Sequence, residues 1–324
     1  MGEGEQVTFC DTKSFTFKII TNLLFDFYTL YIMDPQQNKH TSSSNAASKG
    51  NLSPLPRGGR GLGGEAVSVK ITIATVTYNA AALIERTIRS VEEQTYAAVE
   101  HLIVDGNSRD NTLEIVHHYQ ERNSRARIRH EIVCRSEPDE GLYDAMNKAI
   151  DMATGHYILF LNAGDTLPET DTLTRVAEVA RTIKEKQGTL PAVLYGDTDL
   201  VNAEGHRIGP RRLRPPHTLT WQSFKNGMLV CHQAFFANTA VARLHHYDRR
   251  YRFSADFDWC IRIMKYAEQH HLLLVNLHRV TANYLNEGLT TRNHRASLFE
   301  RFRIMVRHYG FITTIVKHAQ FLMR

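Results

Sequence analysis

The chain has 324 residues, of which 42% are hydrophobic and 23% are charged, and its formal net charge is +5. This composition can bury a sizeable core, which excludes a wholly disordered chain, a collagen-like chain and a disulfide-stapled miniprotein. The four cysteines are far apart and form no CxxC pair, so we expect free thiols and no zinc site.

Residues 1–68 are predicted to be an N-terminal extension and flexible linker. The stretch 34–66 is rich in Ser, Asn, Gly and Pro, as linkers are. The most apolar stretch, 15–33, contains Lys18 and Asp26, which are costly in hydrocarbon, so no transmembrane helix is predicted there. Mostly acidic charges precede this stretch and no small-residue cleavage site follows it, so no signal peptide is predicted.

Strands and helices are predicted to alternate from residue 69 onward. Short β-rich or apolar stretches predict strands at 67–78, 99–106, 128–134 and 156–165. Helical periodicity between them predicts helices at 81–93, 110–122 and 142–153. This alternation is typical of an α/β fold with a doubly wound, mostly parallel sheet.

The pattern changes after residue 190, which predicts a smaller mixed portion packed on the same sheet. Further short strands are expected at 192–201, 231–237, 271–277 and 279–285. A helix is expected at 254–266, and residues 206–216 form a basic loop that contains proline.

Polar residues gather where the four parallel strands are predicted to end, which is where ligands bind in such sheets. They are Thr77, Tyr78, Asn79, Asp105, Asp139, Asn162 and Asp165. Carboxylates can accept the N–H of a pyrimidine or the hydroxyls of a ribose, and can hold Mg²⁺ or Mn²⁺ beside a substrate's phosphates. No GxGxxG motif and no phosphate-loop lysine occur. We therefore expect a nucleotide-diphosphate donor bound through Mg²⁺ or Mn²⁺.

Five short motifs in order carry a resemblance to a known family. They are TVTYN (75–79), VDGNSRDNT (104–112), SEPDEGLYDAMNKAI (136–150), FLNAGD (160–165) and SADFDW (254–259). Together they resemble family 2 glycosyltransferases of the GT-A fold, of the type that builds bacterial colanic acid and cell-surface polysaccharides. The resemblance implies a catalytic domain over 69–291, with a donor-binding half to about 205 and an acceptor-side half after it.

The resemblance also implies roles for individual residues. Tyr78 and Asp105 match positions that hold the base and ribose, Asp165 matches the position at the metal and diphosphate, and Asp256 matches the catalytic base. Further donor contacts are implied for Thr77, Asn79, Asp139, Asp144, Asn147 and Asn162. The usual acidic motif carries more acid than Asn162-Ala163-Gly164-Asp165, which leaves the metal's ligand set open.

The predicted function is transfer of a sugar from a nucleotide-diphosphate sugar to a saccharide or lipid-linked hydroxyl, with inversion implied by the resemblance. Asp258 is an alternative base, and Asp256 is alternatively a carboxylate favoured by the helix dipole. His232 is interpreted either as a contact to acceptor or phosphate or as a structural histidine. The alternative functions are a sugar nucleotidyltransferase, whose basic glycine-rich loop is missing after the first strand, and a non-catalytic sugar-nucleotide or membrane-binding module.

The segment 292–324 is predicted to be a basic amphipathic helix with a possible break at Gly310. Seven basic residues and one acid, Glu300, give it a charge of +6, so the other 291 residues sum to −1. Such a helix suits an anionic membrane surface, and the alternative is docking on the protein's own core or a second subunit. We expect a cytoplasmic protein, peripheral on the inner face of the membrane, and no nucleic-acid partner.

Overall fold

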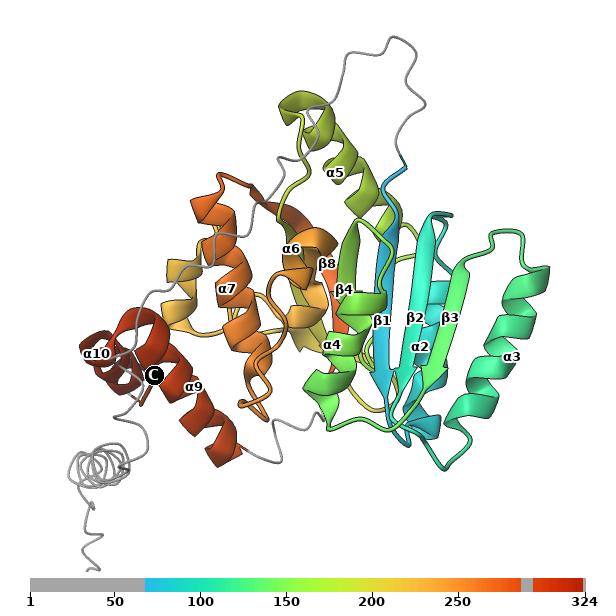
Figure 1. Ribbon diagram of the computed structural model, residues 1–324, viewed down its shortest axis with the longest axis horizontal. Coiled ribbons are helices and arrows are strands. Elements are labelled where there is room, and N and C mark those ends of the chain that lie inside the picture. Colours follow the sequence, from blue (N-terminus) through green and yellow to red (C-terminus); the bar gives the residue numbers. More distant parts are fainter. Residues whose placement is uncertain (1–67, 287–293, 323–324) are drawn as a thin grey trace, which may run out of the picture. The chain divides into compact units, whose positions relative to one another are not determined.

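The computed structural model describes residues 68–286 and 294–322 (Figure 1). Within it, residues 64–317 form one compact unit, to which everything below refers unless stated otherwise. The predicted extension and linker, 1–68, lies outside the described residues except for Ser68.

Four parallel strands form the first half of the sheet, as the sequence predicts. They are β1 (Ile71–Thr77), β2 (Val99–Asp105), β3 (Glu131–Ser136) and β4 (Tyr157–Phe160), in the spatial order β3-β2-β1-β4. The register sets Thr77 opposite Asp105 and Asp105 opposite Ser136, so three strands end at one edge.

Helices cover both faces of this parallel half (Figure 1). They are α2 (Ala81–Glu92), α3 (Thr112–Arg125), α4 (Leu142–Met152) and α5 (Thr172–Gln187). Successive strand side chains point to opposite faces. Ala74 and Val76 of β1 therefore share a buried cluster with α4, whereas Ile71 and Ile73 share one with α5.

The second half of the sheet is mixed, as expected. Its strands are β5 (Val193–Val201), β6 (Arg207–Pro210), β7 (Phe235–Asn238) and β8 (Leu274–Leu285). The order continues β4-β7-β5-β6 with antiparallel pairs, while β8 pairs with β5 in parallel. The remaining elements are α6 (Thr239–Arg243), α7 (Ala255–Gln269), and the 3₁₀ turns η1 (Trp221–Asn226) and η2 (His232–Ala234).

The structure differs from the expected elements at several places. The strand expected at 231–237 begins only at Phe235, because His232–Ala234 form the 3₁₀ turn η2. Strand β6 lies within the stretch expected to be a basic loop, because an exposed edge strand needs only backbone pairing with β5. The two strands expected at 271–277 and 279–285 are one strand, β8, in which His278 takes a φ of +52°. No element was expected at α5, although Leu173, Val176, Ala177 and Ala180 are buried at helical spacing.

The C-terminal segment forms two helices, α9 (His294–Tyr309) and α10 (Phe311–Leu322). They are separated at Gly310, whose φ of +84° confirms the predicted break. Phe302, Ile304 and Met305 of α9 are buried, and His308 bonds to Asp258 of α7, so α9 is docked on the protein. Within 68–286 and 294–322, no helix combines the length and apolar character needed to cross a bilayer.

Candidate active site

The loop after β2 and the end of β3 are tied together around Asp105. The Asp105 carboxylate is buried and accepts hydrogen bonds from the Ser108 amide (2.9 Å), the Ser108 hydroxyl and the Ser136 hydroxyl (2.6 Å). These donors come from two different strand ends, so the last residue of β2 is held in one orientation. A carboxylate accepts up to about four hydrogen bonds, so Asp105 can take a further donor only from a group that reaches its buried position.

Residues in the left-handed conformation connect the loops after β1 and β2. Asn79 has a φ of +48° and Asn107 a φ of +66°, a conformation that asparagine tolerates better than most residues. The backbone N–H of Asn79 donates to Ser108 Oγ (2.8 Å), and the side-chain oxygen of Asn79 accepts from the backbone N–H of Arg109 (2.8 Å). Asn79 is thus placed at the predicted edge, where its polar groups shape the loop.

The missing side chain of Gly106 lets a carboxylate and an aromatic ring lie close to the backbone at this position. A Cβ atom at Gly106 would lie 2.5 Å from Asp139 Oδ2 and 3.4 Å from Tyr78 Cδ2. Tyr78 is 62% exposed although it follows a fully buried strand, and Asp139 is fixed by the Gly141 amide (2.8 Å). The structure therefore brings Tyr78 and Asp139 together, and a flat ring could stack on the tyrosine with its N–H groups toward Asp139.

A second polar cluster forms around Asp256, in the first turn of α7. Its Oδ2 atom lies 3.3 Å from His232 Nδ1, and its Oδ1 atom accepts a hydrogen bond from the Tyr143 hydroxyl at 3.3 Å. Nε2 of His232 in turn lies 3.3 Å from Nδ2 of Asn162, the residue predicted at the end of the fourth strand. Four elements far apart in the sequence thus supply one chain of polar atoms.

The charge states in this cluster suit proton abstraction. Burial pushes the pKa of Asp256 upward, but the hydrogen bond from His232 and the charge of Arg301 outweigh it, so the pKa lies below its usual value. Burial and the nearby Asp256 charge raise the pKa of Tyr143 well above its usual value, so Tyr143 stays a donor. The Asp256 side chain is 14% exposed, so an incoming hydroxyl has a path to it.

Asp165, the predicted metal ligand, is buried behind this cluster. Its two oxygens accept hydrogen bonds from the Leu285 amide (2.9 Å) and the Gln233 side chain (2.9 Å). Burial raises the pKa of Asp165 to about 6, against the effect of these two donors. No group of three His, Cys, Asp or Glu side chains in the described ranges is placed to hold a metal. The residues present therefore do not fit a metal held by Asp165.

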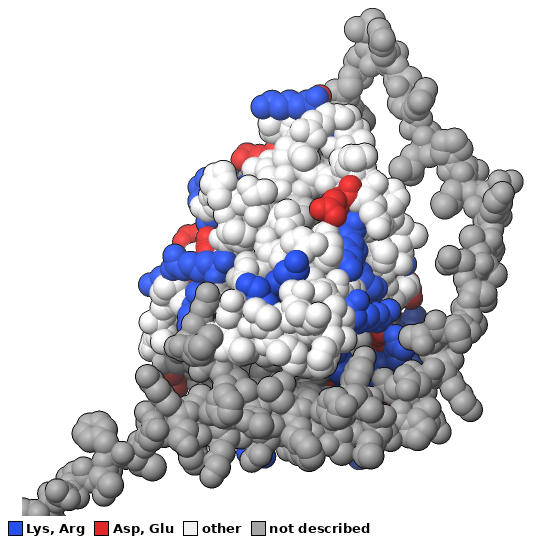
Figure 2. Space-filling model, turned by 90° about the vertical axis from the view of Figure 1, so that its left-hand side faces the viewer, with Lys and Arg blue, Asp and Glu red and all other residues white. Residues whose placement is uncertain are grey.

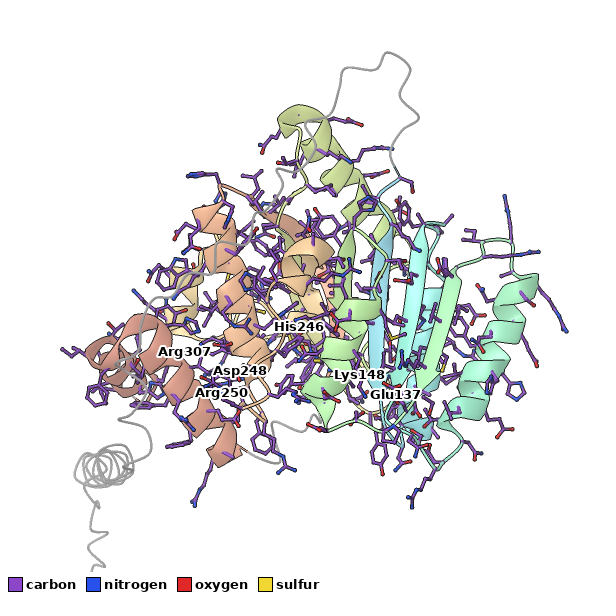
Figure 3. All side chains as sticks on the ribbon, in the orientation of Figure 1. Glu137, Lys148, His246, Asp248, Arg250 and Arg307 are labelled. Carbon is purple, nitrogen blue, oxygen red and sulfur yellow. The ribbon has the colours of Figure 1, made fainter. Side chains whose placement is uncertain are left out.

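Among the described residues, the side chains of three further predicted site residues lie outside the hydrogen bonds around Asp105 and Asp256. The Asn147 side chain bonds to both the N–H (2.7 Å) and the C=O (3.0 Å) of Tyr247, so its amide is already engaged. Asp144 pairs with Arg249 at 2.5 Å and lies 3.5 Å from Lys148. The Thr77 hydroxyl is buried. Figure 3 shows Glu137 and Lys148, which form a 3.1 Å pair beside α4.

The tryptophans and one arginine of the basic loop have structural roles. Trp259 is fully buried and stacks on Tyr247 with ring centroids 4.7 Å apart. Trp221 stacks on Tyr309 of α9 at 5.4 Å. Arg211 donates to the backbone oxygens of Leu213 and Met228.

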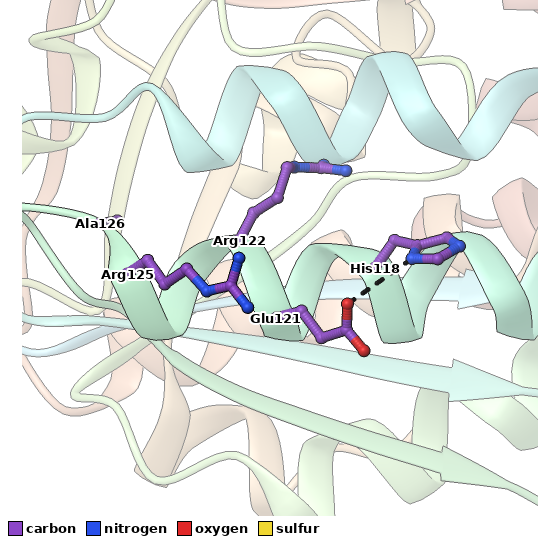
Figure 4. A pocket seen from close by; sticks show the side chains of 5 residues that line it. All are labelled: His118, Glu121, Arg122, Arg125 and Ala126. Carbon is purple, nitrogen blue, oxygen red and sulfur yellow. Dashed lines mark ion pairs between the residues drawn. The ribbon is translucent and has the colours of Figure 1, made fainter.

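A surface hollow on α3 holds none of the predicted site residues. It is lined by His118, Glu121, Arg122, Arg125 and Ala126, with His118 and Glu121 3.7 Å apart (Figure 4). All five side chains come from α3 or the residue that follows it, and Arg122 is already paired with Glu92 at 3.1 Å. This hollow therefore supplies no convergent groups for chemistry.

Two comparisons with known sequences agree with this arrangement. Residues 72–242 match the model of glycosyl transferase family 2. A PGL/p-HBAD biosynthesis glycosyltransferase of Mycobacterium tuberculosis is 34% identical over 218 residues, which cover 67% of this chain and 77% of that protein. A hyaluronan synthase of Pasteurella multocida is 27% identical over 235 residues, 69% of this chain and 22% of that protein.

Solved structures share the fold at low sequence identity. Staphylococcus aureus TarS 1–349 in complex with UDP gives a TM-score of 0.54 at 16% identity, and the match covers 73% of this chain and 64% of that one. A mannosyltransferase from Pyrobaculum calidifontis in complex with GDP-Man and Mn²⁺ gives 0.51 at 16% identity, covering 77% and 69%. With its family match extending over more than half of its length, this chain belongs to glycosyl transferase family 2 and has the GT-A fold.

Proposed function

We propose that the protein transfers a sugar from a nucleotide-diphosphate sugar to a hydroxyl of a saccharide or lipid-linked acceptor, with Asp256 as the base. The observation that carries this proposal is the Asp256 carboxylate, which is ionised, partly open and held on each oxygen by a different donor. A sugar hydroxyl keeps its proton tightly, so a carboxylate within hydrogen-bond reach assists its attack.

With Asp256 as the only base, sugar transfer is a single displacement at the anomeric carbon. The acceptor O–H proton passes to an oxygen of Asp256 as the acceptor oxygen bonds to the anomeric carbon. The bond from that carbon to the phosphate oxygen breaks, and its electron pair leaves with the nucleoside diphosphate. Attack from the face opposite the leaving group inverts the anomeric centre, so inversion is part of the proposal.

The donor nucleotide is assigned to the loops after β1, β2 and β3. The exposed ring of Tyr78 and the carboxylate of Asp139 both lie close to Gly106, and Asp105 is the residue that precedes this glycine. Asn79 and Thr77 support this edge, whereas Asn162 and Asp144 lie on the side that leads to Asp256 and α4. The UDP bound to TarS and the GDP-Man bound to the mannosyltransferase support a nucleoside-diphosphate donor.

The Mn²⁺ of the mannosyltransferase supports the wider prediction of Mg²⁺ or Mn²⁺ for this chain. Because both oxygens of Asp165 accept protein N–H groups, we assign no step to a metal held there. The relatives' names support a role in glycoconjugate assembly, and the cell-surface polysaccharide role rests on the motif resemblance.

We also propose that the protein lies on the inner face of the membrane through α10. Phe311, Ile312 and Val316 are large apolar side chains that are exposed, with Ile312 at 80% and Val316 at 49%. Figure 2 shows the side on which α9 and α10 lie in Figure 1, and Lys and Arg outnumber Asp and Glu on its described part. Exposed apolar side chains suit a lipid surface, and the charge of +6 on 292–324 suits an anionic one.

The central test measures binding and hydrolysis of UDP-, GDP- and dTDP-sugars, with and without Mg²⁺ or Mn²⁺. Wild type should bind and turn over one of them, Tyr78→Ala should weaken its binding, and Asp256→Asn should bind it without turnover. Asp151→Asn, which changes an exposed carboxylate paired with His246, is the matched control and should behave as wild type. If no sugar nucleotide binds, the proposed function is wrong; if one binds and Asp256→Asn keeps full turnover, the base is misassigned.

A further inference from the structure

His232 lies between Asp256 and the end of β4, and the sequence left open whether it contacts acceptor or phosphate or is structural. Asn162 Nδ2 lies 3.3 Å from His232 Nε2, and His232 Nδ1 lies 3.3 Å from Asp256 Oδ2. An amide NH₂ can only donate and a carboxylate can only accept. The contact to Asp256 therefore requires the ring proton on Nδ1, directed at the carboxylate, and with Nδ2 of Asn162 toward the ring, Nε2 accepts.

Two other histidine–aspartate pairs show what is particular about this one. His246 and Asp151 approach to 2.7 Å on the surface, with side chains 40% and 64% exposed. His308 and Asp258 also approach to 2.7 Å, but Asp258 is fully buried and pairs with Arg262 as well. The His232–Asp256 pair is longer, at 3.3 Å, and both side chains keep a small exposed area, 12% and 14%.

The longer contact leaves Asp256 able to change partners. Each of its oxygens has one donor on a separate element, Tyr143 on α4 and His232 on η2, and neither donor is at the optimal distance. An acceptor hydroxyl can then bond to the Asp256 carboxylate without first displacing a short ion pair. At Asp258 the same hydroxyl would have to compete with two short contacts, from Arg262 and His308.

We propose that His232 is a positioning residue for the base: its Nδ1–H orients the Asp256 carboxylate and favours its ionised form, while Asn162 fixes the tautomer of the ring. The inference rests on the proposed function, in which Asp256 takes the acceptor proton. No covalent change occurs at His232, and the proton transferred from the acceptor ends on Asp256.

The surroundings of Asp256 support a distinct contribution from His232. The hydrogen bond from His232 is the leading influence that opposes the upward effect of burial on the pKa of Asp256. The titratable and charged groups around this carboxylate are Tyr143 on α4, Cys231 and His232 at η2, Tyr247, Cys260 on α7, Tyr284 on β8 and Arg301 on α9. Besides His232, Arg301 is the group in this set that lowers the pKa of Asp256. Removing His232 should therefore let burial raise the pKa of Asp256.

The decisive experiment needs no substrate. Protein labelled with ¹³C at the aspartate carboxyl carbon is titrated by NMR, and the Asp256 signal is identified by its loss in Asp256→Asn. In His232→Ala the Asp256 titration should move to higher pH, whereas in His232→Asn, whose amide can still donate near the Nδ1 position, the move should be smaller. His246→Ala, in the surface pair with Asp151, is the matched control and should leave the Asp256 signal unchanged.

Two outcomes overturn the inference in this experiment. One is an Asp256 titration that does not move in His232→Ala; the other is ¹⁵N shifts of the wild-type His232 ring that place a proton on Nε2 near pH 7. If His232→Ala fails to fold, the wild-type ¹⁵N shifts and His232→Asn still decide the matter, and an Asp256 titration in His232→Asn that lies below the wild-type one contradicts the proposal.

A kinetic test separates this inference from the proposed function. With the sugar nucleotide found in the donor panel, His232→Ala should lower kcat by about 10- to 100-fold, as expected for a misplaced base, while KM for the donor stays within about twofold. In an Asp256→Asn background the same change should cause no further loss, since the two residues act as a unit. If no donor is turned over, the proposed function fails, but the NMR titration still tests the pairing of His232 with Asp256.

Discussion

Asp256 and Asp258 lie two residues apart on α7 but serve opposite sides of the helix. Residues two positions apart in an α-helix are separated by about 200° of rotation. Asp256 therefore faces His232, and Asp258 faces α9. Asp258 is fully buried and engaged by Arg262 (2.6 Å) and His308 (2.7 Å). Asp256 has only longer contacts and a path to solvent. Residue type alone does not distinguish these two aspartates; the lengths of their hydrogen bonds and their exposure separate the proposed base from the structural carboxylate.

The largest expected effects come from removing each of the two carboxylates in turn. Asp256→Asn should lower turnover by about 10²- to 10⁴-fold because a general base is lost, with a small change in stability. Asp258→Asn should lower the free energy of unfolding by about 3–5 kcal/mol because Arg262 and His308 lose their buried partner. Urea unfolding and donor turnover on both variants check this, and equal stability losses would erase the distinction.

A second prediction concerns Asp165, which is buried like Asp258. The pKa of Asp165 is raised, however, whereas the pKa of Asp258 is lowered. Burial raises the pKa of Asp258, yet His308 and Arg262 bring it below its usual value, while the pKa of Asp165, whose donors are neutral, is about 6. The folded state therefore binds a proton at Asp165 more tightly than the unfolded chain does. This contribution to stability is present below about pH 4 and is lost as pH rises to about 6.

Asp165→Asn should remove that pH dependence. The stability advantage of wild type over the variant should shrink by on the order of 3 kcal/mol between pH 4 and pH 7. Unfolding measured on both proteins across this range is the test. A wild type that gains stability from Mn²⁺ at pH 7 while Asp165→Asn does not would instead make Asp165 a metal ligand.

The smallest expected effect concerns the outer face of α10 rather than the docked face of α9. Ile312→Asp should weaken flotation with vesicles of phosphatidylcholine and phosphatidylserine by about tenfold, because one exposed apolar side chain is lost from the interface. Ile208→Asp, which changes an exposed isoleucine on β6, is the matched control. Equal flotation of all three proteins would reject α10 as the membrane surface.

The sequence predicted the parts of the site that depend on local pattern. Buried strands followed by polar residues indicated Tyr78, Asp105 and Asp139, and the shared register of β1, β2 and β3 confirms that these strands end at one edge. The alternation of elements and the Gly310 break are confirmed in the same way. These features follow from short-range periodicity and turn chemistry, which a single sequence contains.

The cluster around Asp256 could not be predicted in the same way. Tyr143 lies 113 positions from Asp256 in the sequence and His232 lies 24 positions away, so their meeting depends on how α4, η2 and α7 pack. The state of Asp165 likewise depends on Leu285, 120 positions away. His232 was visible in the sequence, but nothing local distinguished it from a structural histidine.

The docking of α9 has a practical consequence for anyone who shortens this protein. Because His308 bonds to Asp258 of α7 and Tyr309 stacks on Trp221, a fragment ending at residue 291 would lose partners of the helix that carries the proposed base, Asp256. Within the described residues, the smallest self-sufficient fragment should therefore continue through Tyr309, and fusion tags or domain exchanges belong beyond Gly310. A truncation designed to remove only the proposed membrane surface would therefore also disturb the packing of α7.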